Sequence, residues 1–129
     1  CPMPIVEPTI KLEHNDARGS IYSITLPDNK ELMLLFSKAG VFRGGHSHDC
    51  DEIVVLLSGK MWYHKLVDGV EQITVLRAGD TSFNKAGEIH LGEFPTSCWL
   101  IEWKIDTKIG AWSNQNYEPW RARVLESAR

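Results

Sequence analysis

The chain has 129 residues, a formal net charge of −3, 43% hydrophobic residues and 24% charged residues. This length fits a single domain with a proper core, and the composition is that of an ordinary globular protein. The slight negative charge and the lack of a basic stripe argue against binding to nucleic acid, and no apolar run approaches the ~18 residues that a membrane span needs.

Short apolar or alternating segments recur along the chain at intervals of about 8 to 12 residues, a pattern typical of an all-β sandwich or barrel. We predict strands, in chain order, at Ile10–Leu12, Ser20–Leu26, Lys30–Phe36, Val41–His46, Ile53–Leu57, Lys60–Leu66, Val70–Leu76, Thr81–Phe83, Ile89–Phe94 and Cys98–Ile105. Asp68-Gly69 predicts a tight hairpin turn between two of them. After Gly110 the pattern changes, and the segment from Glu118 to Ser127, with Pro119 in its first turn, predicts a short terminal helix.

Three cysteines occur in the chain, at Cys1, Cys50 and Cys98. They form no paired framework of the kind found in disulfide-rich proteins. We therefore expect free thiols, and with them a reducing compartment, the cytoplasm.

Five tryptophans are many for a chain of this length, and Trp62, Trp99 and Trp103 fall on predicted strands. One interpretation is that they pack in the core or against the terminal segment. The other is that exposed aromatic rings on a wide sheet form the interface of a homodimer.

Three of the five histidines share one arrangement with a carboxylate: His46-x-His48-x3-Glu52, followed later by His90. On an extended strand, His46 and His48 point to the same face, whereas on a helix they would point about 200° apart. The two glycines before them disfavour a helix, and Glu52 begins an apolar, β-branched segment typical of a buried strand. Imidazoles with a carboxylate suit iron(II), manganese, nickel, cobalt or zinc. The alternative is a set of surface histidines beside a solvated carboxylate.

Alternation along the strand that carries Met61 predicts which of its neighbours face inward. The apolar Met61 indicates that its face is the inner one, which it shares with Tyr63, so the Tyr63 hydroxyl could bind a substrate or act in catalysis. Tyr63 could also be a plain core residue. Trp62 and His64 would then face outward, while the reversed pattern would make His64 an acid or base in the pocket.

Two further residues are candidates for the site. Arg43 lies three residues before His46, where its guanidinium could bind a carboxylate or phosphate, or simply be solvated in a loop. Glu102 stands among apolar neighbours, which indicates either the solvent side of an edge strand or a buried acid. If it points inward, its pKa should be raised, which would make it a candidate general acid.

The segment from Gly40 to Gly59 resembles the first motif of the cupin superfamily, and the segment from Gly79 resembles the second, G-x5-P-x-G-x2-H-x3-N. The matching positions are Gly40, His46, His48, Glu52 and Gly59 in the first motif and Gly79, Gly87 and His90 in the second. Lys85 stands where proline is usual and Phe94 where asparagine is usual, so a substrate role tied to that asparagine is in doubt. The motifs span residues 40–94 of a predicted single domain, 1–129.

The resemblance implies a jelly-roll β-barrel that encloses one divalent transition metal ion, with iron(II) as the favoured ion, and it implies a homodimer. The metal ligands that it implies are His46, His48, Glu52 and His90. The cupin fold hosts many reactions, so the fold does not choose among them.

The leading expectation is a dioxygenase-type oxidoreductase acting on a small polar or anionic molecule, with Arg43 and Tyr63 positioning the substrate. A metal-assisted isomerase, epimerase or lyase, in which Glu102 or His64 moves a proton, is the first alternative. Residues 16–21 weakly resemble the opening strand of cupins that epimerise or isomerise nucleotide-linked sugars, which typically need no metal. The complete ligand set argues against such a metal-free mechanism here. The second alternative is a non-catalytic cupin that binds a small molecule.

Overall fold

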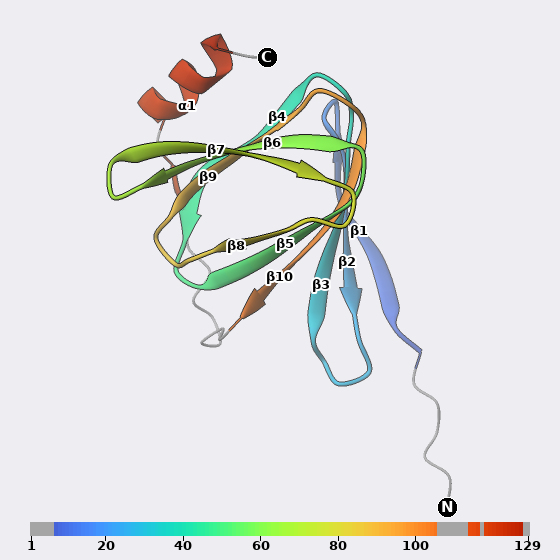
Figure 1. Ribbon diagram of the computed structural model, residues 1–129. Coiled ribbons are helices and arrows are strands. Elements are labelled where there is room, and N and C mark those ends of the chain that lie inside the picture. Colours follow the sequence, from blue (N-terminus) through green and yellow to red (C-terminus); the bar gives the residue numbers. More distant parts are fainter. Residues whose placement is uncertain (1–6, 106–113, 117, 128–129) are drawn as a thin grey trace, which may run out of the picture.

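The computed structural model describes residues 7–105, 114–116 and 118–127. These residues form two antiparallel β-sheets and one C-terminal helix (Figure 1). The first sheet has the order β1-β2-β3-β10-β5-β8, with bounds Thr9–Asp16, Gly19–Thr25, Glu31–Ser37, Cys98–Ile105, Asp51–Ser58 and Thr81–Asn84. The second sheet has the order β11-β4-β9-β6-β7, with bounds Asn114–Asn116, Val41–His48, Ile89–Phe94, Lys60–Val67 and Val70–Arg77. Helix α1 is Glu118–Glu126.

The all-β jelly roll with a short C-terminal helix that the sequence predicts is confirmed. Each of the ten predicted strands has a counterpart, although β1 extends four residues further, to Asp16, than its apolar pattern indicated. The predicted hairpin turn joins β6 to β7, and Asp68 and Gly69 adopt φ values of 50° and 77° there. Positive φ at both turn residues is the requirement of a type I′ turn.

The main core lies between the inner faces of the two sheets. Leu35, Leu100 and Leu56 form one row across the first sheet, because they pair with one another on β3, β10 and β5. Met61 and Phe94 face them from the second sheet, and each of the five is no more than 6% exposed. Phe94, which replaces the usual asparagine of the cupin motif, therefore fills this end of the barrel with hydrocarbon.

A second apolar cluster covers the outer face of the second sheet. Trp120 and Val124 of α1 pack on Ile89 and Leu91 of β9, and all four are buried. Figure 1 shows α1 beside β4, at the top of the barrel. Within the described residues no helix is long and apolar enough to cross a membrane.

Candidate metal centre

A glycine pair, Gly44 and Gly45, turns the end of β4 toward the barrel interior. Before the pair, Phe42 packs on the outer cluster beneath α1, and strict alternation would point His46 and His48 the same way. The pairing of β4 with β9 instead shifts between Gly44 and His46. Both glycines have positive φ, 104° and 91°, as fits a β-bulge. The extra residue of the bulge shifts the alternation of side chains by one position, so that both histidines point inward.

Three imidazole rings consequently meet inside the barrel. His46 and His48 come from β4 and His90 comes from β9, the neighbouring strand, where it pairs with His46. One ring nitrogen of each residue lies within 4.8 Å of those of the other two, and the ring centroids are 4.6, 5.1 and 5.0 Å apart. Small side-chain rotations would bring three nitrogens to the ~2.1 Å bond length of a first-row metal ion. The donors therefore fit one such ion.

Glu52 brings a carboxylate to the same place from β5. Its Oε2 lies 3.7 Å from Nε2 of His48, its Oε1 lies 3.7 Å from Nε2 of His90, and the residue is 2% exposed. Oε1 also accepts a hydrogen bond of 3.1 Å from Nδ2 of Asn84, its partner across the β5–β8 ladder. Burial raises the pKa of Glu52, and the bond from Asn84 opposes that rise. The structure thus brings together the four predicted ligand residues.

Asn84 is a site residue that the sequence analysis missed. It is 1% exposed, and its Nδ2 donates to the hydroxyl oxygen of Tyr63 at 2.7 Å as well as to Glu52. Its Oδ1 accepts from the hydroxyl of Ser82 at 3.3 Å. Because Asn84 is the donor to Tyr63, the phenol keeps its own proton for another acceptor. The available signal was the polar pair Ser82 and Asn84, which share one face of a predicted strand.

Burial favours the neutral form of two imidazoles of the site. It lowers the pKa of His46, and it lowers the pKa of His90 to about 3, with His46 and His48 adding to the effect. Nδ1 of His90 donates to the Glu88 carbonyl oxygen at 3.3 Å, which leaves the lone pair on Nε2, the nitrogen nearest Glu52. Neutral imidazole is the form that binds metals.

Tyr63 faces the site, as alternation along β6 predicts. It is 3% exposed, and its ring centroid lies 5.8 Å from that of His90. Burial, followed by the charges of Glu52 and Glu102, raises its pKa well above the ordinary value. The hydroxyl therefore remains protonated at neutral pH, and it can donate its proton to a further acceptor while its oxygen accepts from Asn84. Its catalytic and substrate-binding roles stay predictions.

Glu102 also points inward, like Leu100 two residues earlier on β10. The β3–β10 ladder ends at Glu102, whereas β10 continues alongside β5 to Ile105. At this fork lies a cleft of about 1120 Å³, whose lining includes both Glu102 and Glu52. Of the two interpretations of Glu102 from the sequence, the structure thus supports the inward-facing acid.

Arg43 ties the two sheets together. From β4, its Nε donates to the Ser37 hydroxyl at 2.7 Å and one Nη donates to the Phe36 carbonyl oxygen at 3.2 Å, both on β3. Burial lowers its pKa, and its charge opposes the rise in the pKa of Glu102. Arg43 is therefore a half-buried strand residue rather than a solvated loop arginine, and substrate binding by it stays a prediction.

His64 lies on the opposite face of its sheet from the other three histidines described above. Its strand partner is Leu91, which packs beneath α1. Its Nε2 lies 2.9 Å from Oε1 of Glu93, and both residues are buried. The outward orientation that alternation predicts for His64 is confirmed, so the alternative of a pocket acid or base at His64 is wrong.

Replacing Glu102 by glutamine should change how stability depends on pH. Burial, followed by the charge of Glu52, raises the pKa of Glu102 to about 8. The metal-free folded protein then keeps a proton that the unfolded chain has lost, so its stability falls between about pH 4.5 and pH 8. Between pH 5 and pH 8, we expect the free energy of unfolding of Glu102→Gln to fall by roughly 3 kcal/mol less than that of the wild type. Urea unfolding of both metal-free proteins at pH 5 and pH 8 measures it, and equal losses in both proteins would contradict the assignment.

No family model and no curated protein matches the sequence. Solved structures do match the fold. The capsular polysaccharide assembling protein CapF of Staphylococcus aureus aligns with a TM-score of 0.67 and 21% identity, over 85% of this chain and 34% of its own. An E162A mutant of the oxalate decarboxylase OxdC of Bacillus subtilis aligns with a TM-score of 0.69 and 20% identity, over 91% of this chain and 33% of its own.

A third structural match comes from a complex of two proteins. Drosophila melanogaster CENP-C bound to CAL1 aligns with a TM-score of 0.61 and 16% identity, over 73% of this chain and 80% of that one. The chain spans only about a third of the length of CapF and of oxalate decarboxylase. At these identities the matches show the fold alone. Together with the sheet topology they show that the chain has a two-sheet jelly-roll fold like that of CapF and oxalate decarboxylase.

Proposed function

We propose that the protein is a mononuclear metal-dependent enzyme that acts on a small polar or anionic molecule, with oxidation by dioxygen as the leading reaction. The observation that carries this proposal is the convergence of His46, His48, His90 and Glu52 on one point inside the barrel. A divalent ion held there would supply Lewis-acid chemistry and, if it is iron(II), redox chemistry.

The surrounding residues have the properties that such an enzyme needs. Tyr63 can donate a hydrogen bond to a substrate oxygen, because Asn84 already donates to its own oxygen. Arg43 supplies a positive charge to the interior from β4, which suits an anionic substrate. The apolar side chains of Met61 and Phe94 close the other end of the barrel and exclude water from it.

The raised pKa of Glu102 favours one second candidate, a metal-assisted isomerase, epimerase or lyase. An acid whose pKa is about 8 is largely protonated at neutral pH, so it can deliver a proton and take it back. Glu102 lines the same cleft as Glu52, which puts it within reach of a substrate that enters there. In this candidate, the metal would polarise a carbonyl group and Glu102 would transfer the proton.

The ligand set accepts several metals, and iron(II) is our leading choice. Oxalate decarboxylase of Bacillus subtilis, whose structure resembles this one, has Mn(II) centres, which supports manganese as the next candidate. We further propose that the protein works in the cytoplasm. The two described cysteines, Cys50 and Cys98, are buried free thiols, as suits a reducing compartment, while Cys1 lies outside the described residues.

One linked experiment tests the proposal. Protein purified without added metal is analysed for its bound metal, and dioxygen uptake is then followed with thiols, diketones, phenolics, small carboxylates and sugars. We expect about one iron per chain and uptake with at least one class. Redox-silent zinc without uptake would overturn the dioxygenase reading. Turnover seen by NMR under anaerobic conditions would then support the proton-transfer candidate, and saturable binding without turnover would indicate a non-catalytic cupin.

A further inference from the structure

The C-terminal elements β11 and α1 lie against the two strands that carry the histidines of the candidate metal centre. Strand β11 pairs with the end of β4, where Asn114 stands opposite His48 and Asn116 stands opposite His46. In the second sheet β4 therefore has β11 on one side and β9 on the other. Without β11, the end of β4 that carries two of the histidines would be an edge strand, with unpaired backbone groups.

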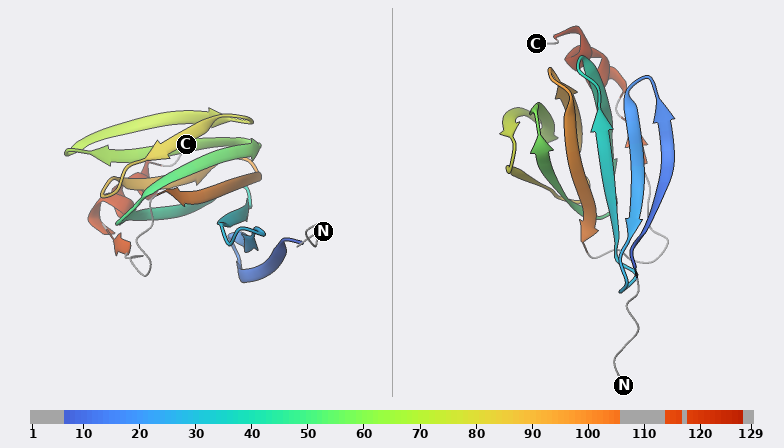
Figure 2. Two further views of the ribbon diagram at one scale, coloured as in Figure 1. Left: turned by 90° about the horizontal axis from the view of Figure 1, so that it is seen from below. Right: turned by 90° about the vertical axis from the view of Figure 1, so that its right-hand side faces the viewer.

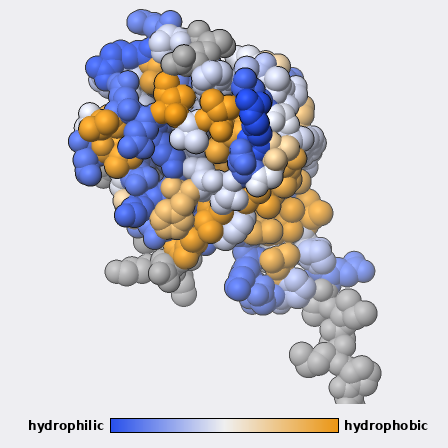
Figure 3. All heavy atoms as spheres, viewed as in Figure 1, coloured by the Kyte–Doolittle hydropathy of each residue, from blue (hydrophilic) through white to orange (hydrophobic). Residues whose placement is uncertain are grey.

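Helix α1 packs on the outer face of that sheet, directly behind His90. Trp120 and Val124 of α1 form a buried cluster with Ile89 and Leu91, the residues on either side of His90. Side chains alternate along a strand, so His90 points from the other face into the barrel. The left-hand view of Figure 2 shows α1 and the β1–β2 hairpin on opposite sides of the molecule, and the visible side of α1, at the upper left of Figure 3, is mostly hydrophilic. The apolar side of α1 therefore faces the strand of His90.

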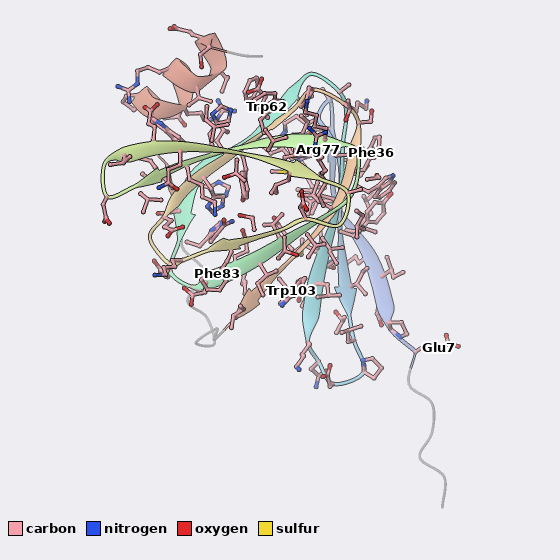
Figure 4. All side chains as sticks on the ribbon, viewed as in Figure 1. Glu7, Phe36, Trp62, Arg77, Phe83 and Trp103 are labelled. Atoms are coloured by element: carbon pink, nitrogen blue, oxygen red, sulfur yellow. The ribbon has the colours of Figure 1, made fainter. Side chains whose placement is uncertain are left out.

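Arg121 joins α1 to the glycine bulge of β4. Its Nε donates to the Gly44 carbonyl oxygen at 3.2 Å. Its side-chain carbons lie against Gly45, where an added Cβ would come within 2.7 Å of Cδ of Arg121. Figure 4 shows Trp62, an outward residue of β6, on the same side of the sheet as α1. Arg121 thus contacts both glycines of the bulge from the outside, opposite the imidazoles.

The bulge needs such a contact to keep one conformation. A bulge disrupts the ladder locally and leaves its extra residue without a partner across it, and glycine loses more conformational freedom on folding than any other residue. A shift of one residue in the strand turns every following side chain to the other face. A change in the conformation of Gly44 and Gly45 would therefore move His46 and His48 away from His90.

We infer that Arg121 is a positioning residue of the metal centre: by fixing the bulge of β4, it holds His46 and His48 toward the barrel interior. The inference rests on the proposed function, since it takes these histidines as metal ligands. Docking of α1 and binding of the metal then stabilise each other, because both favour the same conformation of β4. Arg121 acts from outside the barrel, through the backbone of β4.

Two replacements of Arg121 separate its hydrogen bond from its packing. Methionine keeps an unbranched side chain against Gly45 but has no N–H donor, whereas glutamine places an amide nitrogen at the position of Nε. In calorimetric titrations of the metal-free protein with Mn(II), we expect Arg121→Met to weaken binding about 3- to 10-fold, the cost of one such bond. Arg121→Gln should bind Mn(II) within about twofold of wild type, because it can still donate to the Gly44 carbonyl oxygen.

Arg123 provides the matched control on the same helix. One of its Nη atoms lies 3.4 Å from Oε1 of Glu71 on β7, which is the far edge of the sheet from β4 and β11. Arg123→Met therefore removes an arginine and its contact without touching the bulge. Because the Arg123–Glu71 pair is exposed, Mn(II) affinity should stay within about twofold of wild type.

Hydrogen exchange followed by mass spectrometry gives a readout that needs no metal. In the metal-free protein, the amides of residues 44–48 should exchange about 3- to 10-fold faster in Arg121→Met than in wild type, and at the wild-type rate in Arg123→Met. Added Mn(II) should slow exchange in α1 of the wild type, and it should slow that exchange less in Arg121→Met.

Unchanged exchange at residues 44–48 together with unchanged Mn(II) affinity in Arg121→Met would overturn the inference. So would an equal loss of affinity in Arg123→Met or in Arg121→Gln, because the effect would then come from the stability of α1 or from charge rather than from the bond to the bulge. If the wild-type chain bound no metal ion, the proposed function would fail, whereas faster exchange in Arg121→Met would still support the role of Arg121 in holding β4.

Discussion

Replacing His90 by alanine is expected to weaken binding of a divalent metal ion by more than about 100-fold. Loss of a group that merely orients a ligand costs 10- to 100-fold, and loss of a ligand itself should cost more. His90 stands between the other donors, since its ring lies beside both His46 and His48 and its Nε2 is 3.7 Å from Glu52. Titration of the metal-free protein with Co(II) or Mn(II), followed by calorimetry, measures the change.

His64 provides the matched control for this variant. It is also a buried histidine, on the strand adjacent to that of His90, but it points to the opposite face and pairs with Glu93. His64→Ala should lower stability and leave the metal affinity within about twofold of wild type. Equal losses of affinity in both variants would indicate damage to the fold, and an unchanged affinity in His90→Ala would exclude it as a ligand.

Part of the candidate metal centre could be predicted from the sequence, because His46, His48 and Glu52 lie close together in the chain, whereas His90 was placed there by the resemblance to the second cupin motif. Two histidines two residues apart on a strand must share a face, and Glu52 follows at the start of the next strand. The same alternation correctly predicted that Tyr63 faces inward and His64 faces outward on β6. The role of the glycine pair was not predicted. The sequence indicated only that Gly44 and Gly45 disfavour a helix, whereas in the structure they form the bulge that turns His46 inward.

The parts that could not be predicted depend on contacts between distant segments. Asn84 is 32 residues from Glu52 in the chain and becomes its neighbour only when β8 pairs with β5. Strand β11 has the sequence Asn-Gln-Asn, which has little β propensity, and it is a strand because it pairs with β4 at the edge of the sheet. The contact of Arg121 with Gly44 likewise forms only when α1 packs on the sheet.

Asn84 links Glu52, a candidate ligand, to Tyr63, and its replacement by leucine should affect both. The variant keeps the size of the side chain but removes the donor to Oε1 of Glu52 and to the Tyr63 hydroxyl. We expect metal affinity to fall 10- to 100-fold, as for other partners that orient a ligand. The metal-free protein should lose about 1 to 3 kcal/mol of stability, because two buried polar groups lose a partner. Calorimetric titration with Mn(II) and urea unfolding measure the two effects.

Ser82→Ala is the control for Asn84→Leu, since the Ser82 hydroxyl contacts only the far end of the amide, at 3.3 Å, among the described residues. It should change metal affinity by less than about threefold.

A double-mutant cycle with Glu52→Gln then separates positioning from general destabilisation. If Asn84 acts on the metal by orienting the Glu52 carboxylate, Asn84→Leu should cost little further affinity once that carboxylate is gone. The same 10- to 100-fold loss in the Glu52→Gln background would mean that Asn84 affects the site by another route. Asn84→Leu should still lower the free energy of unfolding in the Glu52→Gln background, because it removes the hydrogen bond from Asn84 to Tyr63 in both backgrounds.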